Sequence, residues 1–312
     1  MTWSAILIVV AVLIAINALF GYIATRRHSP IGNFLDVDGV RLHYIDRGSK
    51  TAPPLLLFHG NGALIEDMTL SGVVDLAAEN YRVICFDRPG FGHSTRPRLQ
   101  LWTPDRQAAL FAKAAKELGV ARPLVLGHSW GTLVALAMAA EPTNGVRGLV
   151  LVSGYYFPTF RLDVWFLSGP AVPIIGDLMR YTISPLLGFL MLPVLLKMMF
   201  APREVPKIFH EEFPKALLLR PGQLRAAAEE SAFMVPAASA LARGYGSIAC
   251  PVAIIAGRDD RLVNSEQAER LQGALPLATG IRVPGFGHMI HHDAPADVVR
   301  AVDMVGQPLR AI

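Results

Sequence analysis

The sequence contains little charge and almost no cysteine. Only 17% of its 312 residues are Asp, Glu, Lys or Arg, whereas 52% are hydrophobic. This composition is too apolar for an ordinary soluble enzyme and indicates contact with lipid. The two cysteines, Cys85 and Cys250, each lie at the edge of an apolar run. This position predicts free cysteines that act as small hydrophobic side chains, and no disulfide framework can be read from them.

Positive charge is nowhere concentrated along the chain. The net charge is only +4, and Lys and Arg neither cluster nor alternate with aromatic residues. Nucleic acid is therefore not expected as a partner. The small positive excess fits a weak attraction to anionic membrane lipid better.

Charge is missing altogether from residues 5–24, where Asn17 is the only strongly polar side chain. A helix of this length extends roughly 30 Å, which is the thickness of a bilayer core. Trp3 and Tyr22 stand near its two ends, where amphipathic rings favour the membrane interface. The segment predicts a single transmembrane anchor.

A cleaved signal peptide is the alternative interpretation of this segment. It is disfavoured because no positively charged region precedes the apolar run, the run is long, and no clear small-residue cleavage site follows. Arg26 and Arg27 follow the run and no Lys or Arg precedes it. The positive-inside tendency therefore predicts that the rest of the chain lies on the cytoplasmic side.

After the anchor, short apolar runs alternate with helix-forming segments, which predicts a parallel sheet with right-handed crossovers. The first two runs flank an Asp-Gly turn and should pair as an antiparallel hairpin. Helices are expected over residues 71–78 and 103–118, the latter with Thr103 as its N-cap. The fold class is therefore α/β, with an eight-stranded, mostly parallel sheet and helices on both faces. The expected strands are residues 34–37, 41–45, 55–58, 82–86, 123–127, 148–152, 251–257 and 280–283.

The central motif is Gly127-His128-Ser129-Trp130-Gly131, which follows an apolar run and precedes helix-forming residues. A strand that passes into a helix through G-x-S-x-G places the serine on a tight, strained turn and exposes its hydroxyl. The following helix directs its N–H groups and positive dipole end at whatever the serine attacks. Ser129 is therefore the candidate nucleophile.

Here the sequence resembles the α/β-hydrolase superfamily, over most of residues 34–305 apart from one insertion. The resemblance implies Ser129 as nucleophile, Asp260 as acid and His288 as base, in the chain order typical of that fold. Asp260 follows the seventh expected strand in a Gly-x-x-Asp pattern, and His288 follows the eighth. The chemistry agrees, because a serine hydroxyl needs an imidazole to take its proton and the imidazole needs a carboxylate to orient it.

Some assignments within this site stay open. Asp259 is adjacent to Asp260 and is the second candidate for the acid, and Asp163 is a weaker third. By the same resemblance, the backbone N–H groups of Asn61, after His-Gly, and Trp130, after the nucleophile, are expected to form the oxyanion hole.

A metal site and a cofactor are not expected. His288, His291, His292 and Asp293 have spacings that can share a helix face, but Gly-His lies in a loop and Pro295 marks the following helix start, so the geometry is poor for a metal. The remaining histidines are interpreted as structural or surface residues: His43, His93, His128 and His210.

Residues 155–246 show no strand alternation, and by the resemblance they form a helical cap over the active site. The stretch 181–196 has no charge, but its length and its Pro and Gly residues argue against a second membrane span. It forms either cap helices packed on the core or a lid in the membrane interface. The expected units are an anchor with its flank (1–28), a first core part (29–154), the cap (155–246) and a second core part (247–312).

Together these features predict a membrane-anchored serine hydrolase that cleaves an ester of an apolar small or lipid-like substrate through an acyl-enzyme. Carbon–carbon bond hydrolysis, thioester hydrolysis and acyl transfer are the alternatives within the fold. Epoxide hydrolases and dehalogenases of this fold usually carry an aspartate where Ser129 stands. A membrane protein of this fold that binds without turnover is the alternative from another class.

Overall fold

The computed structural model describes residues 2–307 and contains one sheet of eight strands. The strand order is β1-β2-β4-β3-β5-β6-β7-β8; the β1–β2 and β2–β4 pairs are antiparallel and the others parallel. The predicted eight-stranded, mostly parallel sheet is confirmed. The strands are β1 (Asn33–Val37), β2 (Val40–Arg47), β3 (Pro54–Phe58), β4 (Arg82–Phe86), β5 (Leu124–His128), β6 (Gly148–Val152), β7 (Val252–Gly257) and β8 (Ala278–Val283).

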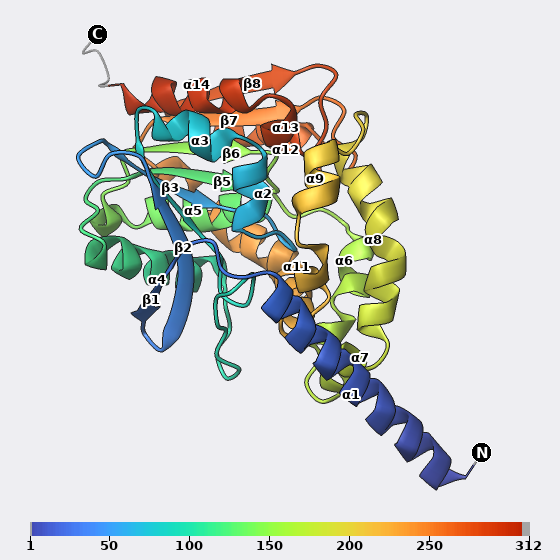
Figure 1. Ribbon diagram of the computed structural model, residues 1–312. Helices are drawn as coiled ribbons and strands as arrows, with labels where there is room; N and C mark the ends of the chain where they lie inside the picture. The colour runs from blue at the N-terminus through green and yellow to red at the C-terminus, as the bar shows by residue number, and fades with distance from the viewer. Residues whose placement is uncertain (1, 308–312) are drawn as a thin grey trace.

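Helices cover both faces of the sheet because its central strands are apolar on both sides (Figure 1). Within β3, Leu56 and Phe58 pack on one face and Leu55 and Leu57 on the other, as a period of two requires. The first face is covered by α4 (Pro104–Glu117), α5 (Gly131–Ala140) and α12 (Glu266–Ala274), and the second by α2 (Ile65–Leu70), α3 (Val73–Ala78) and α14 (Pro295–Gly306).

Helix α4 begins as the sequence predicts. Thr103 is its N-cap and accepts a hydrogen bond from the Arg106 N–H, and Pro104 occupies the first turn, where its missing N–H is not needed. The helix expected over 71–78 begins later, at Val73, because Gly72 has a φ of 81° and separates it from α2. Cys85 is buried and Cys250 half-buried, and both are free.

The chain between β6 and β7 forms the helical cap, on the right-hand side of Figure 1. Pro193 lies inside α8 and does not end it, and Pro185 lies in its first turn, where a proline is tolerated. Its α-helices are α6 (Leu162–Leu167), α7 (Ile175–Tyr181), α8 (Ser184–Phe200), α9 (Lys207–Glu212), α10 (Lys215–Leu218) and α11 (Pro221–Ala242).

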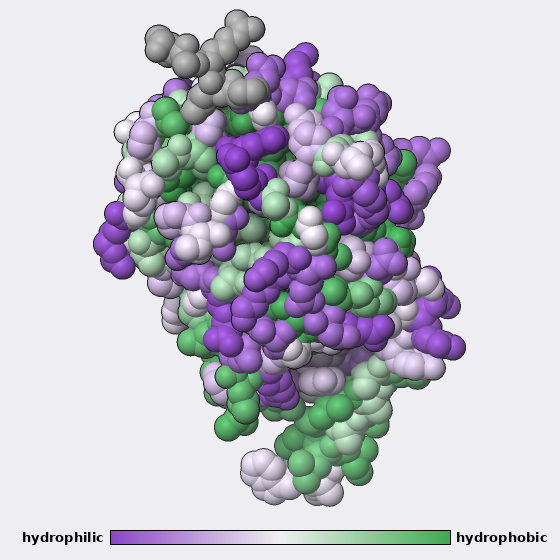
Figure 2. All heavy atoms as spheres, turned by 90° about the vertical axis from the view of Figure 1, so that its left-hand side faces the viewer, coloured by the Kyte–Doolittle hydropathy of each residue, from purple (hydrophilic) through white to green (hydrophobic). Residues whose placement is uncertain are grey.

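Helix α1 (Trp3–Arg27) projects from the body beside the cap (Figure 1) and is long and apolar enough to cross a membrane. In Figure 2 it forms the hydrophobic lower end of the molecule. The helix packs on the body along its C-terminal half, where Ala24 is buried. The Asn17 amide donates hydrogen bonds to the carbonyl oxygens of Tyr181 (2.9 Å) and Thr182 (3.2 Å), at the 67° bend between α7 and α8.

Candidate active site

Ser129 lies on a strained turn between β5 and α5. Its φ of 50° is in the left-handed region, which non-glycine residues rarely adopt. A Cβ at Gly127 would lie 2.5 Å from the Gly131 carbonyl oxygen, and a Cβ at Gly131 would lie 2.2 Å from the Phe58 carbonyl oxygen. The two glycines are therefore required by close backbone packing around the serine.

Three side chains meet at this turn. The Ser129 hydroxyl donates to His288 Nε2 over 3.0 Å, and His288 Nδ1 donates to Asp260 Oδ2 over 2.8 Å. Asp260 follows β7 and His288 follows β8, so both come from loops at the carboxyl ends of the parallel strands. The side chains of His288 and Asp260 are 4% and 2% exposed, so water competes little with this hydrogen bond.

The carboxylate of Asp260 is itself held in place. Its Oδ1 accepts hydrogen bonds from the backbone N–H groups of Leu262 (2.8 Å) and Val263 (3.0 Å), leaving Oδ2 for His288. These bonds fix the direction of the carboxylate.

The two alternative acids face other partners. Asp259 accepts a hydrogen bond from the Gly285 N–H (2.7 Å), and Asp163 pairs with Arg161 on the exposed helix α6. The structure therefore places Asp260, and neither alternative, behind His288.

This difference between adjacent aspartates gives a direct test. Asp260→Asn is expected to lower kcat by about 10⁴-fold, because the amide leaves His288 in the wrong tautomer. Asp259→Asn is the matched control and should change kcat by less than about tenfold, since it loses only a loop hydrogen bond. Steady-state kinetics on both variants decides the assignment, and a larger loss for Asp259→Asn would contradict it.

The two backbone groups expected at the oxyanion hole lie beside the serine turn. Trp130 directly precedes α5, and Asn61 belongs to the loop after β3, whose Gly60 packs against Ser129 and His128. Within residues 2–307 neither N–H group has a hydrogen-bond acceptor. Both side chains are tied to α11 of the cap: Asn61 Nδ2 donates to the Ala227 carbonyl and Trp130 Nε1 to the Glu230 carbonyl.

A buried arginine fixes the loop after β3 through hydrogen bonds to its backbone. Arg88 is fully buried; its guanidinium donates to the carbonyl oxygens of His59 (2.8 Å) and Gly60 (2.9 Å) and forms an ion pair with Glu230 of α11. The sequence does not predict a role for Arg88. No local pattern points to it, because Glu230 is 142 residues away along the chain.

His59 is neutral in this arrangement. Burial, together with the positive charge of Arg88, lowers the pKa of His59 to about 3. Its Nε2 accepts from the Arg88 N–H, and its Nδ1 donates to the Gly60 carbonyl. His59 therefore acts as a fixed hydrogen-bond link within the loop.

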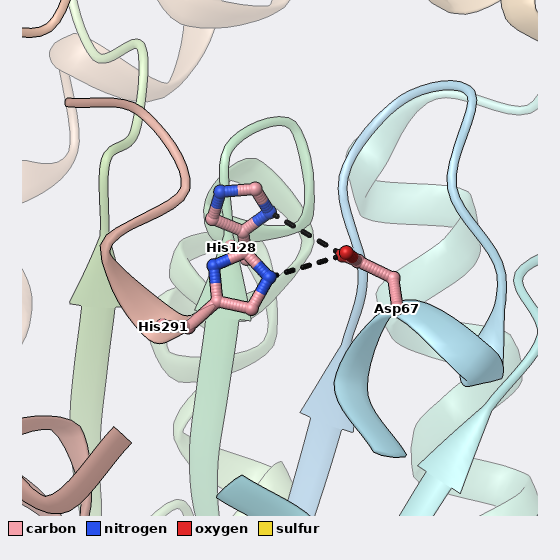
Figure 3. A group of neighbouring side chains, drawn as sticks. All are labelled: Asp67, His128 and His291. Carbon is pink, nitrogen blue, oxygen red and sulfur yellow. Dashed lines mark hydrogen bonds and ion pairs between the residues drawn. The ribbon is translucent and has the colours of Figure 1, made fainter. Parts of the chain in front are cut away.

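Asp67 lies at the centre of a second buried network, and Figure 3 shows it facing His128 and His291. His291 Nε2 donates to Asp67 Oδ2 over 3.2 Å, and His292 Nε2 donates to Asp67 Oδ1 over 2.9 Å. Burial opposes charge on Asp67, but the two histidines hold its pKa well below the usual value. This network fixes α13 (Ile290–Asp293), which begins two residues after His288.

His128 links the serine turn to the His288 loop. Its Nε2 donates to the His288 carbonyl oxygen over 3.2 Å, and its ring lies against that of His291, with centroids 4.1 Å apart. Burial, together with the neighbouring His291, holds the pKa of His128 well below its usual value. The residue preceding the nucleophile thus positions the loop that carries the imidazole.

The metal cluster considered from the sequence does not form around His288, which faces Ser129 and Asp260, whereas His291 and His292 face Asp67. Another group, Asp67, His128 and His291, has potential ligand atoms within 4.8 Å of one another. Hydrogen bonds from two histidines already satisfy the Asp67 carboxylate, so an ion is not needed to explain its burial.

Residues 55–301 match the family model described as the alpha/beta hydrolase family, which covers more than half of the chain. The chain belongs to this family. Like its relatives, it is a hydrolase of the α/β-hydrolase fold.

Relatives of this hydrolase carry out different reactions. It is 26% identical to haloalkane dehalogenase 2 of Mycobacterium tuberculosis over 275 residues, which are 84% of this chain and 90% of the relative. A solved α/β-hydrolase fold protein of Burkholderia ambifaria matches with a TM-score of 0.73 and 24% identity, over 87% of this chain and 97% of that one. A solved membrane phospholipase A, described as a bacterial virulence factor, matches with a TM-score of 0.68 and 21% identity, over 96% and 92% of the two chains. The structural matches show the fold alone.

Proposed function

We propose that the protein is a serine hydrolase that cleaves an ester of an apolar small or lipid-like substrate through an acyl-enzyme. The observation that carries the proposal is the hydrogen-bonded array of Ser129, His288 and Asp260. It lies at the carboxyl end of the central strand β5, where Ser129 occupies a strained turn. Neither a cofactor nor a metal is required for this chemistry.

The proposed reaction has two halves. His288 Nε2 takes the hydroxyl proton as Ser129 Oγ attacks the ester carbonyl carbon, and Asp260 stabilises the resulting imidazolium. The N–H groups of Asn61 and Trp130 stabilise the oxyanion. The imidazolium then protonates the leaving alcohol, and an acyl group remains on Ser129. Water, deprotonated by His288, releases the acid and restores the serine.

The nucleophile type separates this proposal from dehalogenation and epoxide hydrolysis, which the resemblance associates with an aspartate at position 129. Carbon–carbon bond hydrolysis, thioester hydrolysis and acyl transfer use the same array and are the alternatives within the fold. A non-catalytic binding protein is disfavoured because binding alone does not require a hydroxyl, an imidazole and a carboxylate in proton-transfer contact.

Labelling with a fluorophosphonate and a series of p-nitrophenyl esters of increasing acyl length test the proposal. We expect covalent labelling at Ser129 and hydrolysis that favours apolar acyl chains. A protein that neither labels nor hydrolyses any ester would support the binding alternative. Labelling without ester hydrolysis would favour carbon–carbon bond cleavage.

The proposed enzyme is anchored by α1, which is long and apolar enough to cross a membrane. Its body lies on the cytoplasmic side because Arg26 and Arg27 follow the span. The bend between α7 and α8 is bonded to Asn17 of this helix, so the cap stays close to the bilayer.

The cap carries an apolar surface beside the anchor. The twelve side chains of this surface are 38–82% exposed. Helices with a large exposed apolar face are typical of the membrane interface. We therefore place α7 and α8 in the lipid headgroup and acyl boundary, so that a lipid-like substrate reaches Ser129 from the bilayer. The apolar cap surface consists of Ile174, Ile175, Leu178, Tyr181, Ile183, Leu186, Leu187, Phe189, Leu190, Met191, Val194 and Met198.

Tryptophan quenching by brominated acyl chains tests this placement in the full-length protein. Trp3 and Trp165 are the exposed tryptophans of the described chain and are first replaced by phenylalanine. Phe189→Trp in this background should be quenched strongly in brominated phosphatidylcholine vesicles. Met304→Trp, on α14 at the other end of the molecule from α1 (Figure 1), is the control and should be quenched little. Equal quenching of the two variants would contradict an embedded cap.

A further inference from the structure

A hollow of about 370 Å³ lies between the C-terminal end of α1 and the first turn of α11. Apart from backbone and small residues, polar and basic side chains surround it. They come from α1, the loop after β4 and α11: Thr25, His93, Arg96, Arg220, Gln223 and Arg225.

The charge at the hollow is unbalanced. Arg96 and Arg225 share one carboxylate, that of Glu229. Arg220 bonds only to neutral groups within the described chain, including the Gly92 carbonyl and the Thr25 hydroxyl. Three guanidinium groups at the hollow therefore have one acidic hydrogen-bond partner, and Glu230, which also acts on Arg96 through charge, is itself paired with Arg88. Such an excess of guanidinium donors is typical of sites for phosphate or carboxylate groups.

Two other carboxyl groups, Asp87 and Glu66, act on Arg220 through charge without accepting a hydrogen bond from it. Asp87 already accepts hydrogen bonds from the His43 imidazole and from the Ile65 and His93 backbone N–H groups. Burial and the charge of Asp87 raise the pKa of Glu66 to about 7, so this carboxyl is partly neutral near neutral pH.

Two side chains that line the hollow each carry a donor without a partner within residues 2–307. Arg96 Nη2 and Gln223 Nε2 are both buried without an acceptor, and their side chains are almost fully buried. The Gln223 amide is correctly oriented, because its Oε1 accepts from the Gly92 N–H over 3.0 Å. Buried donors are normally satisfied, so these two groups indicate a ligand that supplies acceptors.

The backbone reinforces this preference. Helix α11 has 22 residues and begins at Pro221, and Gly222 and Gln223 of its first turn line the hollow. The first N–H groups of a helix have no intrahelical partner, and the helix dipole adds positive potential there.

We infer that this hollow binds a phosphate group. The ligand is either the headgroup of an anionic phospholipid or free phosphate. Thr25 directly follows the uncharged stretch of α1 and precedes Arg26 and Arg27, so the hollow lies at the level where the proposed anchor leaves the bilayer. This position favours the lipid headgroup and is the one step that rests on the proposed membrane anchoring.

The test uses native mass spectrometry of the full-length protein in detergent micelles. Dioleoyl phosphatidylglycerol, dioleoyl phosphatidylcholine and inorganic phosphate are titrated separately. We expect one tightly bound phosphatidylglycerol and at least about tenfold weaker phosphatidylcholine, since only the first adds a net negative charge. Binding of inorganic phosphate alone would identify the site as one for free phosphate.

Two variants and one control make the result decisive. Gln223→Glu keeps an acceptor for the Gly92 N–H and adds a negative charge. Arg220→Gln removes a guanidinium group. Each substitution should weaken the binding of the anion by at least about tenfold. Arg300→Gln, an exposed residue of α14, should change nothing. Circular dichroism verifies the fold, and Gln223→Glu decides if Arg220→Gln does not fold.

The inference is overturned if neither anion binds, or if anion binding survives in the folded variants. Hydrolysis is not a readout of this experiment, and detergent replaces the bilayer. Failure of the phosphate site is therefore distinguishable from failure of the proposed hydrolase or of the proposed anchor.

Discussion

Ser129→Ala is expected to lower ester hydrolysis by about 10⁵- to 10⁶-fold and to abolish fluorophosphonate labelling. The substitution removes the atom that attacks the ester, and the remaining array can contribute only through binding and the oxyanion hole. Thermal unfolding should stay cooperative, because the hydroxyl is exchanged for hydrogen on the same turn. Steady-state kinetics with a p-nitrophenyl ester measures the loss.

Ser153→Ala is a matched control for this experiment. Ser153 follows β6 as Ser129 follows β5, is buried, and has a similar φ of 49°. No imidazole is bonded to its hydroxyl within the described residues, so the variant should retain hydrolysis and labelling. If Ser129→Ala retained more than about 1% of the rate, catalysis through this serine would be refuted.

The second large effect concerns stability. Glu230→Leu is expected to lower the free energy of unfolding by about 3–5 kcal/mol, because it leaves the charge of Arg88 buried without its partner. Both side chains of this ion pair are 0% exposed, so screening by water is negligible. Urea unfolding followed by tryptophan fluorescence measures the change.

A double substitution separates the lost charge partner from lost packing. Arg88→Met/Glu230→Leu should recover much of the stability lost in Glu230→Leu, since apolar replacement of a whole buried pair is often close to neutral. Asp163→Asn removes one partner of the exposed pair with Arg161 and should cost about 0–1 kcal/mol. If the double variant were as unstable as Glu230→Leu, the unpaired charge would not be the cause.

The sheet, and the candidate active site at the carboxyl ends of its strands, could be predicted from the sequence because local patterns encode them. The run Leu55–Phe58 is apolar on both faces, as a central parallel strand requires. The glycines around Ser129 mark a turn that larger side chains cannot form. Spacing from Gly257 selected Asp260 over Asp259, and the structure places Asp260 beside His288.

The supporting networks could not be predicted, because they join residues far apart in the chain. Asp67 meets His291 and His292 only after the sheet has formed, and Arg88 meets Glu230 only when the cap has folded onto the core. Helix α8 passes through Pro193 although proline disfavours a helix interior. The bounds of α8 therefore do not follow from local propensity alone.

The hydrogen bonds from Asn17 to the Tyr181 and Thr182 carbonyl oxygens make α1 a structural partner of the bend between α7 and α8. A generic apolar helix grafted in its place would leave these two carbonyl groups without the amide donor. The native helix therefore forms part of the cap structure. A chimaera that exchanges this helix needs an amide side chain at the position of Asn17.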